Sequence, residues 1–235
     1  MYKAVIDQGN TRCKVGIFSK MGILEEVHIT QTFQEAIDYI NSKSIKIVIT
    51  NHKTETEIYP DFNIYYLNHR FKLPFLNLYK KPETLGLDRI ASLAAAAILF
   101  PNQNTLIFDV GTCITIDFLN ENNAYNGGNI SPGLKMRYKA MHHFTSKLPL
   151  STVENIFPKM GNTSMSAIAN GAFYGIVNEL NGYITDFKKD YQNLNIIICG
   201  GDTLHFDKQL KTEIFAKPNL VLEGLYQLLL LNENK

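Results

Sequence analysis

Two short segments of the sequence place an aspartate and a glycine directly after an apolar run. The segment VIDQGNT covers residues 5–11, and IFDVGT covers residues 107–112. A β-prone run follows each segment, which predicts two strand-turn-strand hairpins with a carboxylate where the first strand ends. Glycine lets backbone N–H groups approach an anion closely. A single Asp-Gly turn is an ordinary hairpin connector, but two of them in equivalent places predict a site for the phosphates and metal ion of a nucleotide.

Each hairpin has groups suited to phosphate and to cations. We expect Asp7 to hold a hydrated Mg²⁺ ion, because hard cations prefer carboxylate and water oxygens. Asp109 would lie near a second cation. Backbone N–H groups and small polar side chains would cradle phosphate oxygens in both hairpins, at Gly9, Asn10, Thr11, Gly111 and Thr112.

A third segment, YKKPETLGLDR at residues 79–89, carries an acid and a base side by side. Asp88 falls in the first turns of an expected helix, where a loop delivers it and the helix fixes it. An alcohol that accepts a phosphoryl group needs such a carboxylate to take its proton, and Arg89 could bind an anionic group of that acceptor through two hydrogen bonds. The alternative is a helix-initial aspartate stabilised by the helix dipole, with Arg89 as a surface partner.

Two glycine pairs indicate places of close approach. The segment NGGNISPG at residues 126–133 puts Gly-Gly inside a strand-like run, which weakens a sheet unless a ligand or another backbone must come near; a bulge before a helix explains it equally well. Gly200 and Gly201 follow a buried strand and would suit an adenine or a ribose, although a plain tight turn also fits.

Composition and absent motifs exclude several classes of protein. The 23 basic and 22 acidic side chains balance, which gives no support for a nucleic-acid-binding surface. No P-loop, dinucleotide-binding or hydrolase-elbow motif is present. The amino-terminal stretch lacks the apolar core of a signal peptide, and no apolar stretch is long enough to span a bilayer. We therefore expect a cytoplasmic protein.

The cysteines and the paired histidines do not predict a metal or redox centre. Cys13, Cys113 and Cys199 are scattered through apolar runs, as expected of free buried thiols in a reducing compartment. His142 and His143 are adjacent on an expected helix and point to different faces, so we expect them to be structural or surface residues.

The hydrophobic pattern predicts the order β-β-β-α-β twice. In the first half we expect strands at 2–6, 12–18, 23–29, 45–50 and 63–67, and helices at 33–42 and 85–100, the latter capped by Thr84. In the second half we expect strands at 105–108, 113–119, 124–130 and 195–199, and helices at 134–147, 164–189 and 219–231. The duplication predicts two α/β lobes with mixed sheets, residues 1–103 and 104–235, with a nucleotide cleft between them.

Taken together, these motifs resemble the type III pantothenate kinases of the acetate-and-sugar-kinase/actin-like superfamily. The resemblance rests on four strings in order, which are Asp-x-Gly-Asn-Thr from Asp7, Leu-Gly-x-Asp-Arg from Leu85, Asp-x-Gly-Thr from Asp109, and Gly-Gly-x-Ile-x-Pro-Gly from Gly127. It implies two ribonuclease-H-like lobes and ATP-dependent phosphorylation of pantothenate, the first step towards coenzyme A. It also implies a homodimer, Mg²⁺ with ATP, and a monovalent cation, K⁺ or NH₄⁺.

The resemblance assigns roles residue by residue. Asp88 matches the catalytic base, and Asp109 matches the ligand of the monovalent cation. Acceptor binding is implied for Tyr79, Gly86, Leu87 and Arg89, and for Thr163, which looks like the residue that reaches the partner subunit's acceptor site. The nucleotide contacts implied are those of Asp7, Gly9, Asn10 and Thr11, of Gly111, Thr112 and Thr115, and of Gly200 and Gly201 at the adenosine end.

Two features depart from the family's pattern, and two other functions compete. Gln8 and Cys113 replace smaller or apolar spacer residues. We expect these replacements to adjust the nucleotide site without loss of function. One competing function is a kinase for another small alcohol on the same scaffold, such as a sugar. The other is a non-catalytic nucleotide-binding regulator, against which the presence of Asp7, Asp88 and Asp109 argues.

Overall fold

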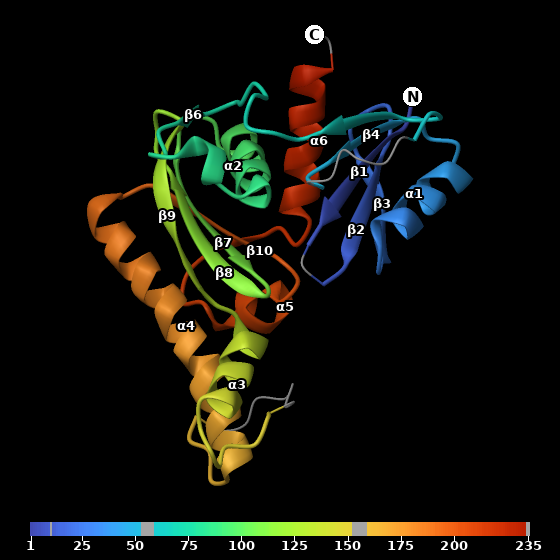
Figure 1. The fold of residues 1–235 in the computed structure, drawn as a ribbon. Helices are drawn as coiled ribbons and strands as arrows, with labels where there is room; N and C mark the ends of the chain where they lie inside the picture. Colours follow the sequence, from blue (N-terminus) through green and yellow to red (C-terminus); the bar gives the residue numbers. More distant parts are fainter. Residues whose placement is uncertain (10, 53–58, 152–158, 234–235) are drawn as a thin grey trace. The chain divides into compact units, whose positions relative to one another are not determined.

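The computed structural model describes residues 1–9, 11–52, 59–151 and 159–233. The elements form two sheets with helices packed on them (Figure 1). This arrangement confirms the predicted α/β class with mixed sheets. The strands are β1 (Lys3–Gln8), β2 (Cys13–Phe18), β3 (Leu24–Thr30), β4 (Ile47–Thr50), β5 (Asn63–Tyr66), β6 (Leu76–Asn77), β7 (Asn104–Val110), β8 (Cys113–Leu119), β9 (Ala124–Pro132), β10 (Leu194–Cys199) and β11 (Phe215–Ala216).

The helices differ widely in length. The α-helices are α1 (Phe33–Ser42), α2 (Leu87–Leu99), α3 (Leu134–His143), α4 (Ser164–Asp190), α5 (Thr203–Phe206) and α6 (Leu220–Asn232), and 3₁₀ turns cover Pro82–Thr84 and Asp207–Gln209. No described helix is long and apolar enough to cross a membrane.

The first sheet has the strand order β3-β2-β1-β4-β5. β1 and β2 form an antiparallel hairpin, while β4 runs parallel to β1 and β5 runs parallel to β4. Side chains alternate between the faces of a strand. Ile6 and Val15 therefore share the face that packs on α1, and the opposite face packs on α6 (Figure 1).

The second sheet has the order β11-β10-β7-β8-β9-β6. β10 lies parallel to both β7 and β11, and β6 lies parallel to β9. The buried residues of β7, β8 and β10 form one apolar cluster with the inner face of α4, whose members include Phe108, Phe173 and Ile198.

The chain packs into two compact units, each built from more than one stretch of sequence. The first consists of residues 1–102, 119–127 and 219–235, and the second of residues 103–118 and 128–218. The C-terminal helix α6 belongs to the first unit because it packs on α2, β1, β2 and β4. The two duplicated lobes expected at 1–103 and 104–235 stay a prediction. The compact units are defined by which residues pack together, whereas the lobes are defined by a repeated order of elements.

The predicted helices and strands are confirmed within two residues at each end, except for the end of α3. α2 begins at Leu87 with Gly86 as its N-cap, because Pro82–Thr84 forms a separate 3₁₀ turn; the predicted cap at Thr84 is wrong. The Thr84 hydroxyl instead donates to the carbonyl of Lys81 at 2.8 Å. α3 ends at His143, before the predicted Lys147. β6, β11 and α5 were not predicted, because they are too short to carry a periodic pattern.

Candidate active site

Asp7 stands near the carboxyl end of β1, on the face that α6 covers. Along β1, Val5 and Asp7 point to the face opposite Ile6, which packs among the α1 residues. In the antiparallel register, Asp7 pairs with Lys14 of β2, so both side chains lie on the same face. Alternation thus removes Asp7 from the α1 core. It places Gln8 on the core face instead, where its Oε1 is buried and makes no hydrogen bond with the described residues.

Asn51 fixes the end of β1 from the neighbouring parallel strand. It directly follows β4, whose Thr50 is in register with Ile6. Its side-chain amide donates to Asp7 Oδ1 at 2.7 Å, and its side-chain carbonyl accepts the Gln8 N–H at 2.7 Å. One buried amide therefore orients the carboxylate and the strand end together. Sequence reasoning missed Asn51, although the rule that parallel strands end at the same edge could have found it.

Ionisation of the Asp7 carboxyl is disfavoured in the folded protein, where its pKa is raised. Burial is the largest influence on its pKa and raises it, and the negative charge of Asp88 raises it further. The hydrogen bond from Asn51 and the positive charge of Lys14 act in the opposite direction but do not cancel these effects. Asp7 and Asp88, which are far apart in the sequence, are therefore electrostatic neighbours within the first unit.

Asp88 is exposed in the first turn of α2, as the sequence predicts. Its Oδ1 accepts the backbone N–H of Arg89 at 2.9 Å. A Cβ atom added to Gly86 would lie 2.4 Å from the same oxygen, so a larger residue there would require the carboxylate to move. The helix start thereby holds Asp88 in one place while leaving it accessible to a substrate.

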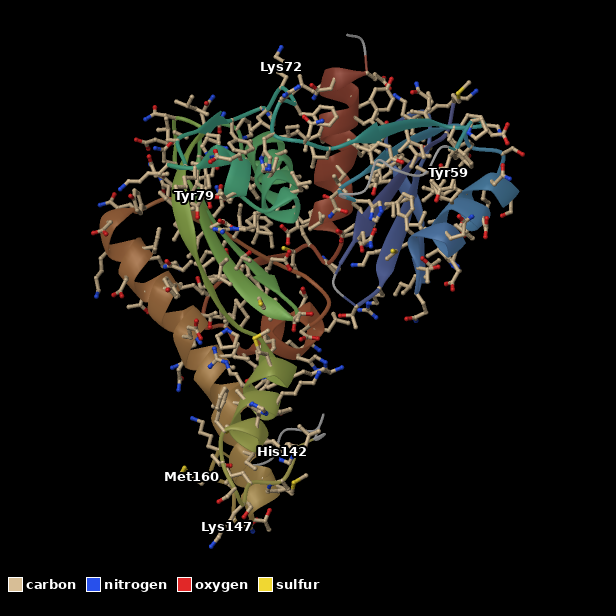
Figure 2. All side chains as sticks on the ribbon, viewed as in Figure 1. Tyr59, Lys72, Tyr79, His142, Lys147 and Met160 are labelled. Carbon is tan, nitrogen blue, oxygen red and sulfur yellow. The ribbon has the colours of Figure 1, made fainter. Side chains whose placement is uncertain are left out.

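Arg89 is buried, with 6% of its surface exposed, so the interpretation as a surface partner of Asp88 is wrong. Its guanidinium donates to the hydroxyl of Tyr125 at 2.8 Å. The Tyr125 ring stacks on Tyr79 with centroids 6.0 Å apart. Figure 2 shows Tyr79 on the segment that follows β6. Gly127, with φ of +149°, lies beside Tyr79, where an added Cβ would come within 3.9 Å of its ring. The structure therefore brings Tyr79, Arg89 and this glycine together.

The glycines of the two hairpins use their own N–H groups within the turns. The Gly9 N–H donates to the carbonyl of Arg12 at 3.1 Å, and the Gly111 N–H donates to that of Cys113 at 3.0 Å. A threonine lies one or two residues after each glycine. Thr11 and Thr112 are both exposed there, whereas Asn10 lies outside the described residues.

In the second unit, the turn after β7 is held against the start of α3. The Gly133 N–H donates to the carbonyl of Thr112 at 3.2 Å. A Cβ atom on Gly133 would lie 2.0 Å from the carbonyl oxygen of Gly111, so the two segments touch through backbone alone. The Pro-Gly step before α3 is thus in backbone contact with the Asp-x-Gly-Thr turn.

Asp109 and the Gly200–Gly201 pair also lie together. Asp109 is in register with Cys199 of β10, directly before Gly200. Gly200 has a φ of +94°, and a Cβ atom there would lie 2.4 Å from both Asp109 Oδ1 and the Val110 carbonyl oxygen. The Asp202 N–H donates to that carbonyl at 3.0 Å. Only glycine fits this corner, which explains the second glycine pair by contact with β7.

The remaining predicted residues have plainer surroundings. Thr115 is half-buried on β8, Gly201 is exposed, and Leu87 begins α2. Thr163 is exposed and caps α4, exchanging hydrogen bonds with Ser166. His142 and His143 end α3 (Figure 2), and His142 Nδ1 contacts the Leu148 carbonyl at 2.8 Å. Among the described residues, no three His, Cys, Asp or Glu side chains gather as metal ligands would.

The chain shares its fold with solved structures of differently named proteins. One solved structure, of a Baf family transcriptional activator from Campylobacter jejuni, matches 99% of this chain with a TM-score of 0.63 and 21% identity, and 100% of its own chain is covered. Another, an activator of 2-hydroxyisocaproyl-CoA dehydratase from Clostridium difficile with bound ADPNP, matches with a TM-score of 0.54 and 13% identity over 100% of this chain and 97% of its own. At these identities the likeness defines the fold alone.

Sequence comparison defines the family. The family model of type III pantothenate kinase matches residues 4–186. A type III pantothenate kinase of Phocaeicola vulgatus is 40% identical over 97% of this chain and 98% of its own length. The type III pantothenate kinase of Flavobacterium johnsoniae is 36% identical over 94% of this chain and 95% of its own length. The chain belongs to the type III pantothenate kinase family, as the four motifs predict.

Proposed function

We propose that this chain transfers the γ-phosphoryl group of ATP to the primary hydroxyl of pantothenate, with Asp88 as the general base. The kinase activity and its place at the start of coenzyme A synthesis follow from the family. The observation that supports the role of Asp88 is its position. An exposed carboxylate stands at the start of α2, directly before the buried Arg89 in the sequence, and its charge acts on Asp7.

The proposed reaction is a direct in-line displacement. The acceptor hydroxyl gives its proton to an Asp88 carboxylate oxygen as its own oxygen bonds to the γ-phosphorus, and ADP leaves. Phosphoryl transfer needs little covalent help from the protein, so positioning and electrostatic stabilisation supply most of the acceleration. Arg89 would bind the carboxylate of pantothenate, and Tyr79, Gly86 and Leu87 would line the pocket around it.

The residues around Asp7 suit a magnesium ion that accompanies ATP. A carboxylate whose pKa is raised by burial gains stability from a nearby cation, and Asn51 already holds it in one orientation. When bound, the ion would neutralise charge on the phosphates. Thr11 after the first hairpin and Thr112 after the second, with Asn10, Gly9, Gly111 and Thr115, form the proposed phosphate contacts; Gly200 and Gly201 would face the adenosine.

Three finer points belong to the same proposal. Asp109 would bind a monovalent cation, K⁺ or NH₄⁺, whose fixed positive charge adds to that of Mg²⁺. The active form would be a homodimer in which Thr163 reaches the partner's acceptor site. None of the three cysteines, all of which the structure describes, is in a disulfide, which suits a reducing cytoplasm.

The variant Asp88→Asn tests the proposed base. We expect pantothenate-dependent ADP release to fall by about 100-fold or more, because the amide cannot accept the proton, while ATP binding by calorimetry stays unchanged. Glu83→Gln is the matched control, since Glu83 is an exposed acid on the preceding 3₁₀ turn. The assay is run in K⁺ and repeated in Na⁺. Near-normal turnover by Asp88→Asn would remove Asp88 from its role.

The same assay separates the competing functions. A panel of sugars and other alcohols in place of pantothenate would reveal a kinase for a different acceptor. ATP binding without ADP release, in the presence of pantothenate, K⁺ and Mg²⁺, would favour a nucleotide-binding regulator. The Campylobacter jejuni protein is described as a transcriptional activator, but the acids at positions 7, 88 and 109 support catalysis here.

A further inference from the structure

Tyr125 is a polar partner of the buried Arg89 side chain. It lies on β9, directly before the segment Asn126–Gly127–Gly128, and its surface is 0% exposed. Its hydroxyl oxygen accepts a hydrogen bond of 2.8 Å from an Nη of Arg89. A hydrogen bond to a charged donor is among the stronger ones in proteins, and it restricts the plane in which the guanidinium can lie.

The tyrosine ring is itself held on two sides. Tyr79 stacks on it at a centroid distance of 6.0 Å and an interplanar angle of 21°, and Phe75 meets it edge-on at 6.5 Å. The strand carrying it is anchored too, since the Tyr125 carbonyl accepts the Leu78 N–H at 2.9 Å. The hydroxyl therefore occupies a fixed point from which it can orient Arg89.

Arg89 adjoins Asp88 in the sequence, so a small rotation of the guanidinium changes what an acceptor meets next to the base. A guanidinium binds a carboxylate best through two parallel hydrogen bonds, which demand one orientation. A guanidinium that is poorly oriented keeps its positive charge but cannot form both parallel hydrogen bonds to the carboxylate. An uncharged acceptor would be much less sensitive to the loss.

We propose that Tyr125 is a positioning residue that sets the preference of this enzyme for a carboxylate-bearing acceptor. Its hydroxyl holds the Arg89 guanidinium in the plane that the acceptor's carboxylate requires, while its ring supports Tyr79. This inference rests on the proposed function of Arg89 and extends it to a residue whose own side chain is fully buried.

The test compares two acceptors with the variant Tyr125→Phe, which removes only the hydroxyl. One acceptor is pantothenate, and the other is pantothenyl alcohol, in which an uncharged hydroxymethyl group replaces the carboxylate. We expect the KM for pantothenate to rise by about 10-fold or more, the scale of a lost charge-assisted hydrogen bond. The KM for ATP and kcat/KM for the alcohol should change by less than about twofold, so the preference for pantothenate falls.

The control is Tyr226→Phe, because Tyr226 is a buried tyrosine of the same unit that stacks on Phe18. An equal fall in kcat/KM for both acceptors, or an unchanged preference for pantothenate, would overturn the proposal. A purely structural role of Tyr125 would change kcat/KM for both acceptors by the same factor. Calorimetric binding of the two acceptors gives the same comparison without turnover. Wild-type protein that binds pantothenate but never releases ADP would overturn the proposed function and leave the binding comparison to decide on Tyr125.

Discussion

At the scale of single residues, Asp7 illustrates how a site can oppose the stability of its own fold. Its carboxyl sits where burial and the charge of Asp88 both disfavour ionisation. Asn51 and Lys14 only reduce this cost. Such an arrangement suits a group whose charge is to be balanced by a cation bound with the nucleotide.

The variant Asp7→Asn should therefore be more stable than the wild type when no nucleotide is present. A carboxyl with a raised pKa in the folded state stabilises the protein below its unfolded pKa, and this contribution disappears as pH rises through the folded pKa. The difference in Tm between variant and wild type should thus grow with pH across that range, by about 2–4 °C for each kcal/mol removed. Scanning calorimetry between acidic and neutral pH measures it.

Asp61→Asn is the control for Asp7→Asn, because Asp61 is an exposed acid of the same unit. Addition of Mg²⁺ and ATP should raise the Tm of the wild type but not that of Asp7→Asn. A nucleotide-free Asp7→Asn that melts below the wild type at neutral pH would contradict the assignment.

At the scale of elements, the position of Asp88 depends on how closely α2 approaches α6. The four alanines at 94–97 of α2 are buried. A Cβ atom on Gly224 of α6 would lie only 1.8 Å from the carbonyl oxygen of Ala91. Small residues on both helices thus bring α2 close to α6, which itself packs on β1. The helix that begins with Asp88 is in this way held near the strand that carries Asp7.

Gly224→Ala should destabilise the protein, although alanine is the better helix former. Overpacking of about 1–3 kcal/mol outweighs the gain in helix propensity, and Tm should fall by roughly 2–12 °C. We also expect kcat to fall, because α2 must shift. Gly182→Ala in α4 is the matched control, since no atom lies within 4 Å of its added Cβ. A Gly224→Ala variant as stable as Gly182→Ala would disprove the tight contact.

At the scale of the whole molecule, the proposed homodimer makes each acceptor site depend on two chains. Thr163 caps α4, and its side chain is exposed. If it reaches the partner's site, Asp88 and Thr163 of one site come from different subunits. A symmetric dimer would then allow two damaged chains to complete one intact site.

Mixing Asp88→Asn with Thr163→Val after unfolding and refolding should therefore restore activity. Half of the dimers would be mixed, each with one intact site, which predicts about a quarter of the wild-type activity. Thr163→Ser, which keeps the capping oxygen, is the control for helix stability. The readout is ADP release before and after exchange, with sedimentation to establish the dimer. No recovery in a mixture shown to contain mixed dimers would place Thr163 outside the partner's site.

Much of the fold and part of the site could be predicted because their signals are local. The hairpin of β1 and β2, helix α1 and the long α4 follow from hydrophobic periodicity over a few residues. Asp7, Asp88 and Asp109 could be chosen because a strand end or a helix start places them. Thr84 was a wrong cap because the preceding proline favours a 3₁₀ turn that competes with the first turn of α2.

The sequence by itself therefore determined the α/β class, the order of all but the shortest elements, the family and the acids that could do chemistry. Only the tertiary structure decided the surroundings of those acids. Asn51 on Asp7, Tyr125 on Arg89 and Gly133 on the turn at Gly111 are contacts between residues far apart in the chain. Such contacts arise from strand register and helix packing, which no local pattern of residue types encodes.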